Sequence, residues 1–375
     1  MSNQPAVVGP DGVARPYIGG QALIEGVMMR SPHAFAAVLR RRDGSLLVRE
    51  EPMRDVRQGA LALPFVRGAV ALFEALKLGS RALRFSADVY EKDLEEAERE
   101  GKAPPPAPGI VSLVSLPIVA LATNEPETPG VSPRDDDPKR KLVTWLSVAF
   151  ALALFVALPQ AFAEGTSSLL DLGLDVRSSG FQLLTGAAKL VIVVGYMLLI
   201  RRIPEIHRVF QYHGAEHKAI YAYESGDGLS VGSARPKTTL HPRCGTTFIV
   251  MVALVSILVF TGIGPFLPQV GLGRLADNVL FFLMKLPFLP VIAAITFELQ
   301  RLLARYATKG PLRALLWPGF LVQKITTIEP DDRQLEVALA ALAVTLERES
   351  APGTAASGDR SFADFGELRA PAAAE

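Results

Sequence analysis

Several common features are scarce or missing in this sequence. It has a single cysteine, Cys244, so no disulfide can form within one chain. The formal net charge is only +1, so no overall electrostatic attraction to nucleic acid is expected. The first residues have neither the basic segment nor the apolar core of a cleavable signal peptide, so we expect no such leader. These absences argue against a disulfide-stabilised secreted domain and against a nucleic-acid-binding protein.

Apolar residues, in contrast, make up 49% of the chain, and they are concentrated in a few runs. Four runs approach or exceed the length that spans the hydrocarbon core of a bilayer, namely residues 143–162, 183–200, 248–266 and 279–299. We therefore predict a mainly α, polytopic helical membrane protein with four transmembrane helices.

Basic residues indicate how these four helices are oriented. They cluster before the first run, between the second and third, and after the fourth, and include Lys139, Arg140, Lys141, Arg201, Arg202, Arg208, Lys218, Arg301 and Arg305. The positive-inside rule then predicts a multi-pass protein of the cell membrane, with both termini and the long loop 201–246 in the cytoplasm. Its first expected partner is the lipid bilayer.

The rest of the chain divides by composition. We predict an N-terminal cytoplasmic segment (1–103), a proline-rich and acidic linker (104–141), the membrane domain (142–305), interfacial and amphipathic helices (306–350) and a disordered tail (351–375). Within the first segment, a β-hairpin is expected around Asp43-Gly44, because Asp-Gly favours a tight turn. A helix over about 56–90 is expected to lie along the membrane surface, and the apolar piece 110–122 is too short to span alone.

Four of the five histidines and the only cysteine fall in one interval, between the second and third apolar runs. Within it, His213, Glu216 and His217 form an H-x-x-E-H pattern, as in the inverted zincins. Residues i, i+3 and i+4 of a helix share one face. Both imidazoles can therefore bind one metal ion, while Glu216 is close enough to a bound water to act as a general base.

Two histidines are too few for a zinc site, which takes three protein ligands plus water in an enzyme, or four in a structural role. The nearest further donors are His241, Cys244 and Glu224. Imidazole together with thiolate favours zinc over other divalent transition metals, and iron is the alternative. If all four nitrogen and sulfur donors bind, catalysis is disfavoured.

A different interpretation needs no metal. The histidines can be polar residues that pack a cytoplasmic helix onto the membrane, bonded to backbone carbonyls or to lipid phosphate. The crowding of these residues around the sole cysteine favours the metal site. For His207, next to Arg208, contact with lipid is favoured instead.

A second candidate region is the glycine-bounded segment 17–32. Its Gln21, Glu25 and Arg30 are candidates to orient a substrate or to complete the shell around a metal. The alternative is a tight turn with solvated charges.

Three blocks of the sequence, residues 19–32, 212–218 and 241–246, resemble the hallmark blocks of the YqhQ-like family, a bacterial family of unknown function described as predicted metal-dependent membrane proteins. The resemblance covers most of the chain, and the insert between residues 92 and 141 departs from it. It implies a metal at His213 and His217 and a place in the bacterial inner membrane. It implies no substrate.

The sequence thus predicts a membrane protein with a cytoplasmic zinc-type site, acting as a metal-dependent hydrolase on a peptide or lipid-linked substrate near the membrane surface. One alternative is a non-catalytic scaffold or assembly factor with a structural metal. Another is a small transporter, suggested by Lys285 and Glu298 inside or near the fourth run. Against the transporter stand the few spans and the lack of a repeated half.

Overall fold

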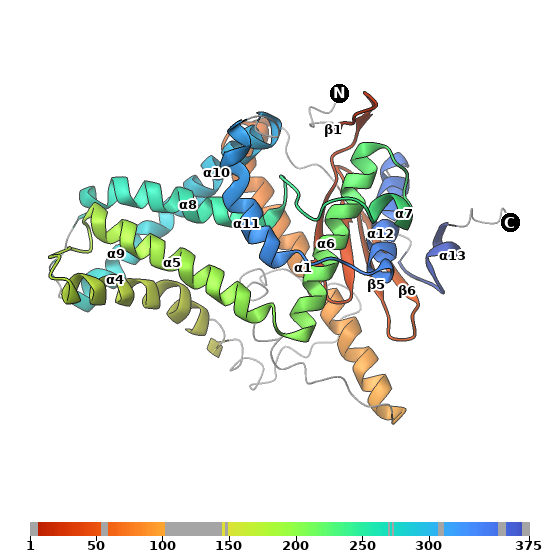
Figure 1. Cartoon of the computed structure of the whole chain (residues 1–375), viewed down its shortest axis with the longest axis horizontal. Coiled ribbons are helices and arrows are strands. Elements are labelled where there is room, and N and C mark those ends of the chain that lie inside the picture. The colour runs from red at the N-terminus through yellow and green to blue at the C-terminus, as the bar shows by residue number, and fades with distance from the viewer. Residues whose placement is uncertain are drawn as a thin grey trace.

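The structure is a computed structural model and describes residues 7–53, 59–101, 145–146, 149–268, 271, 274–306, 311–351 and 358–369. The predicted linker 104–141, with its apolar piece 110–122, lies outside the described residues. Figure 1 shows two parts, a group of long helices on the left and a sheet packed among helices on the right.

Four helices are long and apolar enough to cross a membrane, and they coincide with the four predicted runs: Ala149–Leu169, Ser179–Ile200, Gly245–Phe266 and Ala276–Leu303. The first joins a π-helical turn η2 (Ala153–Ala157) to α4 (Leu158–Leu169), the second is α5 (Ser179–Ile200), and the third joins α8 (Gly245–Ile263) to η3 (Gly264–Phe266). Their apolar side chains remain largely exposed; Val191 and Leu258 are each 72% exposed.

The fourth of these helices is interrupted. It consists of α9 (Arg274–Lys285), a 3-10 turn η4 (Leu286–Phe288) and α10 (Leu289–Tyr306). Pro287 and Pro290 explain the interruption, because proline lacks the N–H that a helix interior needs. After α10 come the 3-10 helix η5 (Pro311–Leu316) and α11 (Trp317–Thr326), which packs on α8.

The N-terminal segment forms a sheet larger than the predicted hairpin. Its antiparallel order is β3 (Gly19–Leu23), β4 (Gly26–Arg30), β5 (Ala34–Arg40), β6 (Leu46–Pro52) and β7 (Asp359–Phe362). A separate two-stranded ribbon pairs β1 (Val7–Val8) with β2 (Ala14–Arg15). The predicted hairpin is confirmed as β5 and β6, with Gly44 at a φ of 94° in the turn.

Two expectations for this region are wrong. The glycine-rich segment is two paired strands, β3 and β4, and only Glu25 lies in the tight turn that joins them. The predicted disordered tail contains β7 and the short helix α13 (Phe365–Arg369). β7 pairs with β6, a strand more than 300 residues away in sequence, so no local pattern could indicate it.

Helices cover both faces of the sheet, so almost every residue of β5 is buried. Side chains alternate along a strand. Val27 and Met29 therefore point to one core, with α6 (Pro204–Ser225) and α12 (Asp332–Ser350). Met28 and Leu39 point to the other, with α1 (Val66–Arg99).

α1 differs from the predicted surface helix over 56–90. Its later part supplies Leu78, Ala82 and Phe85 to the sheet core, and it continues to Arg99. Its first part packs against α10, where Arg67 Nε lies 2.7 Å from Glu298 Oε1. Glu298 thus anchors α1.

α12 begins where the sequence predicts a cap. The Asp331 carboxylate accepts a hydrogen bond from the Gln334 backbone N–H at 2.8 Å, and the Gln334 side chain accepts one from Asp331 N–H in return. Leu335, Leu339 and Leu342 are fully buried between the sheet and α6. α12 is thus a core helix of this domain, and the expectation of an interfacial helix is wrong for it.

Candidate metal centre

The H-x-x-E-H pattern lies in the middle of α6. This helix starts at Pro204, just after α5 ends, and stops at Gly226, whose φ of 76° closes the helix. Every residue from Tyr212 to Ile220 is buried, although His213, Glu216, His217 and Lys218 are polar. Figure 1 shows why: α6 runs between the sheet and α12 on one side and the α11 region on the other. Buried polar side chains require partners, so this segment is where a bound group is expected.

The two histidines hold the same side of their rings against the backbone. His213 Nδ1 lies 2.8 Å from the Thr326 carbonyl oxygen, and His217 Nδ1 is bonded to the Thr239 carbonyl oxygen. A carbonyl oxygen only accepts, so Nδ1 carries the proton and each Nε2 is the remaining ring nitrogen. Metal-binding histidines in proteins are oriented by the same kind of bond.

Cys244 meets these nitrogens. His213 Nε2 lies 3.1 Å from Cys244 Sγ, and the ligand atoms of His213, His217 and Cys244 all lie within 4.8 Å of one another. His217 Nε2 is buried and has no hydrogen-bond partner among the described residues. The sequence prediction that these three residues converge is confirmed, and the cluster could hold a metal ion.

Local charges suit a thiolate in this cluster. Cys244 is the N-cap of α8, where a helix terminus favours negative charge. Burial raises the pKa of Cys244, but His213 and His217 outweigh it and hold that pKa well below its usual range. Burial lowers the pKa of His213, yet Cys244 and Glu216 raise it to about 9. Without a metal, an imidazolium and a thiolate face each other, and a bound cation takes the place of the proton.

Glu216 lies beside the cluster and against the sheet. Its side chain packs on Gly20 of β3, where an added Cβ would lie 2.8 Å from its carboxylate carbon. Its Oε2 is buried without a hydrogen-bond partner among the described residues. Burial raises the pKa of Glu216 to about 7, although the two histidines oppose the shift. A glycine at position 20 is thus what leaves room for this carboxylate.

The other two predicted ligands lie just outside the group of three. The His241 ring centroid is 5.6 Å from that of His217, and its Nε2 is buried without a hydrogen-bond partner in the described part of the chain. Burial lowers the pKa of His241 to about 4, so its ring is neutral. Glu224 pairs with Arg243 and lies 3.6 Å from His241 Nε2. The structure brings His241 near the cluster, whereas it directs Glu224 to Arg243.

Some positioning residues escaped sequence reasoning. Gln323 of α11 is fully buried, and its amide accepts from His241 N–H and donates to the His241 carbonyl, each at 2.7 Å. Gln300 of α10 donates to the Cys244 carbonyl at 3.2 Å. These amides hold the segment that carries His241 and Cys244. A glutamine within an apolar helical stretch was the available signal.

The three predicted substrate residues have other neighbours. Gln21 packs against Gly79 of α1, on the face of β3 opposite to Glu216. Glu25 accepts from Arg208 Nε at 2.6 Å and from the Tyr212 hydroxyl at 3.3 Å, which ties the β3–β4 turn to α6. Arg30 pairs in register with Gly19 on β3. A role of these residues in substrate binding stays a prediction.

Fold and site together define a class: a mainly helical protein with four helices able to cross a membrane, joined to a sheet-and-helix domain that encloses a His/His/Cys cluster. The chain belongs to the family of proteins of unknown function DUF1385, which it matches over residues 63–348. It is 30% identical over 327 residues to the uncharacterized protein YqhQ of Bacillus subtilis (strain 168), a match that covers 86% of this chain and 90% of that protein. The predicted family resemblance is confirmed. No solved structure matches the chain.

Proposed function

We propose that this protein is an integral membrane protein whose cytoplasmic domain binds one divalent transition metal ion, zinc in the first place, and uses it for hydrolysis. The observation that carries the proposal is the convergence of His213 Nε2, His217 Nε2 and Cys244 Sγ, with both Nδ1 atoms occupied by backbone carbonyls. Two nitrogens and one sulfur suit zinc. Three protein donors leave a coordination position for water.

Glu216 supports a catalytic role for such a metal. Its free carboxylate oxygen is buried next to the donors, where it can take a proton from a metal-bound water. A zinc ion in this site would polarise that water, while Glu216 accepts its proton and Gly20 keeps the carboxylate in place. The site lies nine residues after Pro204, about 14 Å along α6 from the end of the second span. A peptide or lipid-linked substrate near the membrane surface fits this position.

Membrane insertion is part of the proposal. It is supported by the length and hydropathy of the four helices and by their exposed apolar side chains. The basic residues at the ends of α5 and α10 place the termini and the metal centre on the cytoplasmic side.

A second candidate is a structural metal in a non-catalytic scaffold. The observation that favours it is His241, whose buried Nε2 lacks a hydrogen-bond partner in the described region and whose ring adjoins His217. If His241 moves onto the metal, coordination is closed by three nitrogens and one sulfur. No water would then remain for hydrolysis.

The Glu216→Gln variant separates these two candidates. We expect full metal content, since Glu216 is not among the three converging donors, and a loss of hydrolysis of about a hundredfold or more, since a general base supplies that much. Metal analysis and cleavage of fluorescein-labelled casein by the purified full chain measure the two quantities. In cobalt-substituted protein, an open site with bound water gives an absorption spectrum that titrates with pH. A spectrum that is independent of pH but altered by His241→Ala would show a closed site and refute the catalytic proposal.

The proposed orientation predicts where reporter domains are active. Alkaline phosphatase, which is active only outside the cytoplasm, should be active when inserted after Gly173 and inactive when inserted after Gly226 or at the C-terminal end. Green fluorescent protein at the last two positions should fluoresce, which controls for expression. Phosphatase activity at the C-terminal end would contradict the orientation.

A further inference from the structure

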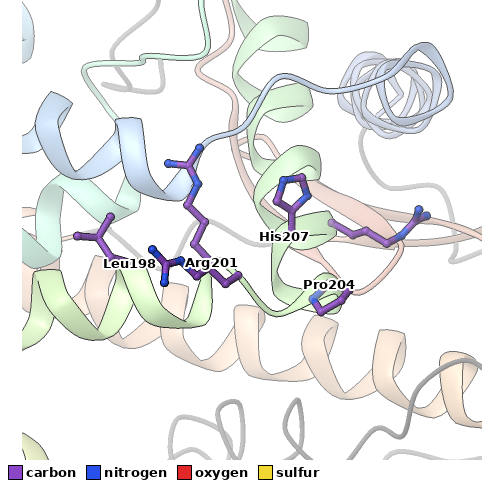
Figure 2. Close-up of a pocket in the computed structure, with 6 residues that line it drawn as sticks. Leu198, Arg201, Pro204 and His207 are labelled. Carbon is purple, nitrogen blue, oxygen red and sulfur yellow. The ribbon is translucent and has the colours of Figure 1, made fainter.

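A pocket of about 720 Å³ lies at the bend between α5 and α6, away from the metal centre. Figure 2 shows its lining, with Leu198 on α5, Arg201 after the end of that helix, and Pro204 and His207 on α6. Arg202 and Arg208 complete the lining. Three guanidinium groups and an imidazole around one hollow are suited to bind an anion, and a phosphate in particular.

Part of this positive charge is compensated within the chain. Arg208 is paired with Glu25, and Glu205 lies on the same turn of α6. Arg201 gives only one N–H, through Nη1, to the Lys324 carbonyl at 2.8 Å. Arg202 and His207 are exposed. Arg201 and Arg202 are therefore the main source of attraction for an anion.

The surroundings of the pocket point to an amphipathic ligand. Leu198 forms an apolar wall, and the adjacent Leu199 is 65% exposed. On α11, Trp317 and Leu321 are also exposed, and Lys324 lies over the Trp317 ring at 5.9 Å. Tryptophan with basic residues at the end of an apolar helix is typical of the headgroup level of a membrane.

We propose that this pocket binds the phosphate headgroup of an anionic phospholipid from the leaflet that contacts the end of α5. The arginines bind the phosphate, while Leu198 and Leu199 contact the start of the acyl chains. A free phosphate ion would use the arginines and leave the apolar wall without a role. The inference rests on the proposed membrane insertion and is independent of the metal.

Native mass spectrometry of the full chain, released from nanodiscs of mixed phosphatidylglycerol and phosphatidylcholine, tests this proposal. We expect the wild type to retain phosphatidylglycerol in preference. Each arginine near a charged lipid surface contributes about a fivefold change, so the double variant Arg201→Gln, Arg202→Gln should lose at least about tenfold in retention. The matched control is Arg301→Gln, which removes an equal charge at the end of another span and should retain the lipid.

The remaining arms separate the other outcomes. The single variant Arg202→Gln changes only an exposed side chain, so it reports on binding even if loss of the Arg201 hydrogen bond disturbs folding. Equal retention of phosphatidylcholine, or an equal effect of Arg301→Gln, would overturn the proposal. Displacement of the lipid by millimolar inorganic phosphate would show that free phosphate is the ligand and also overturn it. Extraction of the protein from vesicles by alkaline carbonate would instead show that membrane insertion fails.

Discussion

Replacement of both His213 and His217 by alanine is expected to lower the metal content of the purified protein from about one ion per chain to nearly none. The reason is geometric. These residues supply two of the three converging donor atoms, and a lone Cys244 sulfur does not hold a divalent ion tightly. Elemental analysis by inductively coupled plasma mass spectrometry gives the metal content directly.

The matched control is His207→Ala, which removes an exposed imidazole from the same helix and should leave the metal content unchanged. Cys244→Ser is a milder second variant, and we expect it to weaken zinc binding at least about tenfold while the chain stays folded. A chelator should lower the melting temperature of the wild type and have no effect on the double variant, because a bound ligand stabilises only the folded state. Equal metal content in the wild type and the double variant would remove the metal site altogether.

Gly214→Ala is expected to destabilise the protein by about 1–3 kcal/mol, the usual cost of overpacking in a core. A Cβ on Gly214 would lie far inside the van der Waals distance from the Ile328 carbonyl oxygen. That carbonyl cannot easily move away, because the Ile328 N–H donates to the Phe210 carbonyl at 3.0 Å. The same segment carries the Thr326 carbonyl that orients His213, so metal binding should weaken as well.

The control for this prediction is Gly195→Ala in α5, where an added Cβ meets nothing within 4 Å. There the better helix propensity of alanine is expected to stabilise slightly, by at most about 1 kcal/mol. Thermal unfolding of the purified proteins, followed by circular dichroism, measures both effects. If Gly214→Ala melts at the same temperature as the wild type, the close approach of Ile328 to α6 is not a constraint.

Glu216 shows how far a spacing rule reaches. Helical periodicity correctly places Glu216 and the two histidines on one helix, because an i, i+3, i+4 relation is local. It does not indicate that Gly20, almost 200 residues earlier, makes the room for the carboxylate. It also nominates Glu224, which lies on the right helix but pairs with Arg243.

The sheet illustrates the same limit. The hairpin of β5 and β6 follows from its Asp-Gly turn, whereas β3 is glycine-rich and becomes a strand only because it pairs with β4 and packs under α6. β7 lies in a tail of small residues, and the edge of β6 is what orders it. Strand propensity depends strongly on such neighbours.

From its sequence alone, this protein is determined to be mainly helical, with four apolar segments of membrane length, one hairpin, a capped final helix and a helix bearing His213 and His217. Hydropathy, turn preference and helical spacing are properties of neighbouring residues, so they can be read without coordinates. Only the tertiary structure decided that Cys244 meets those histidines, that Gln323 positions His241, and that the sheet is covered on both faces. Such contacts join residues tens to hundreds of positions apart, and long-range packing, not local preference, selects them.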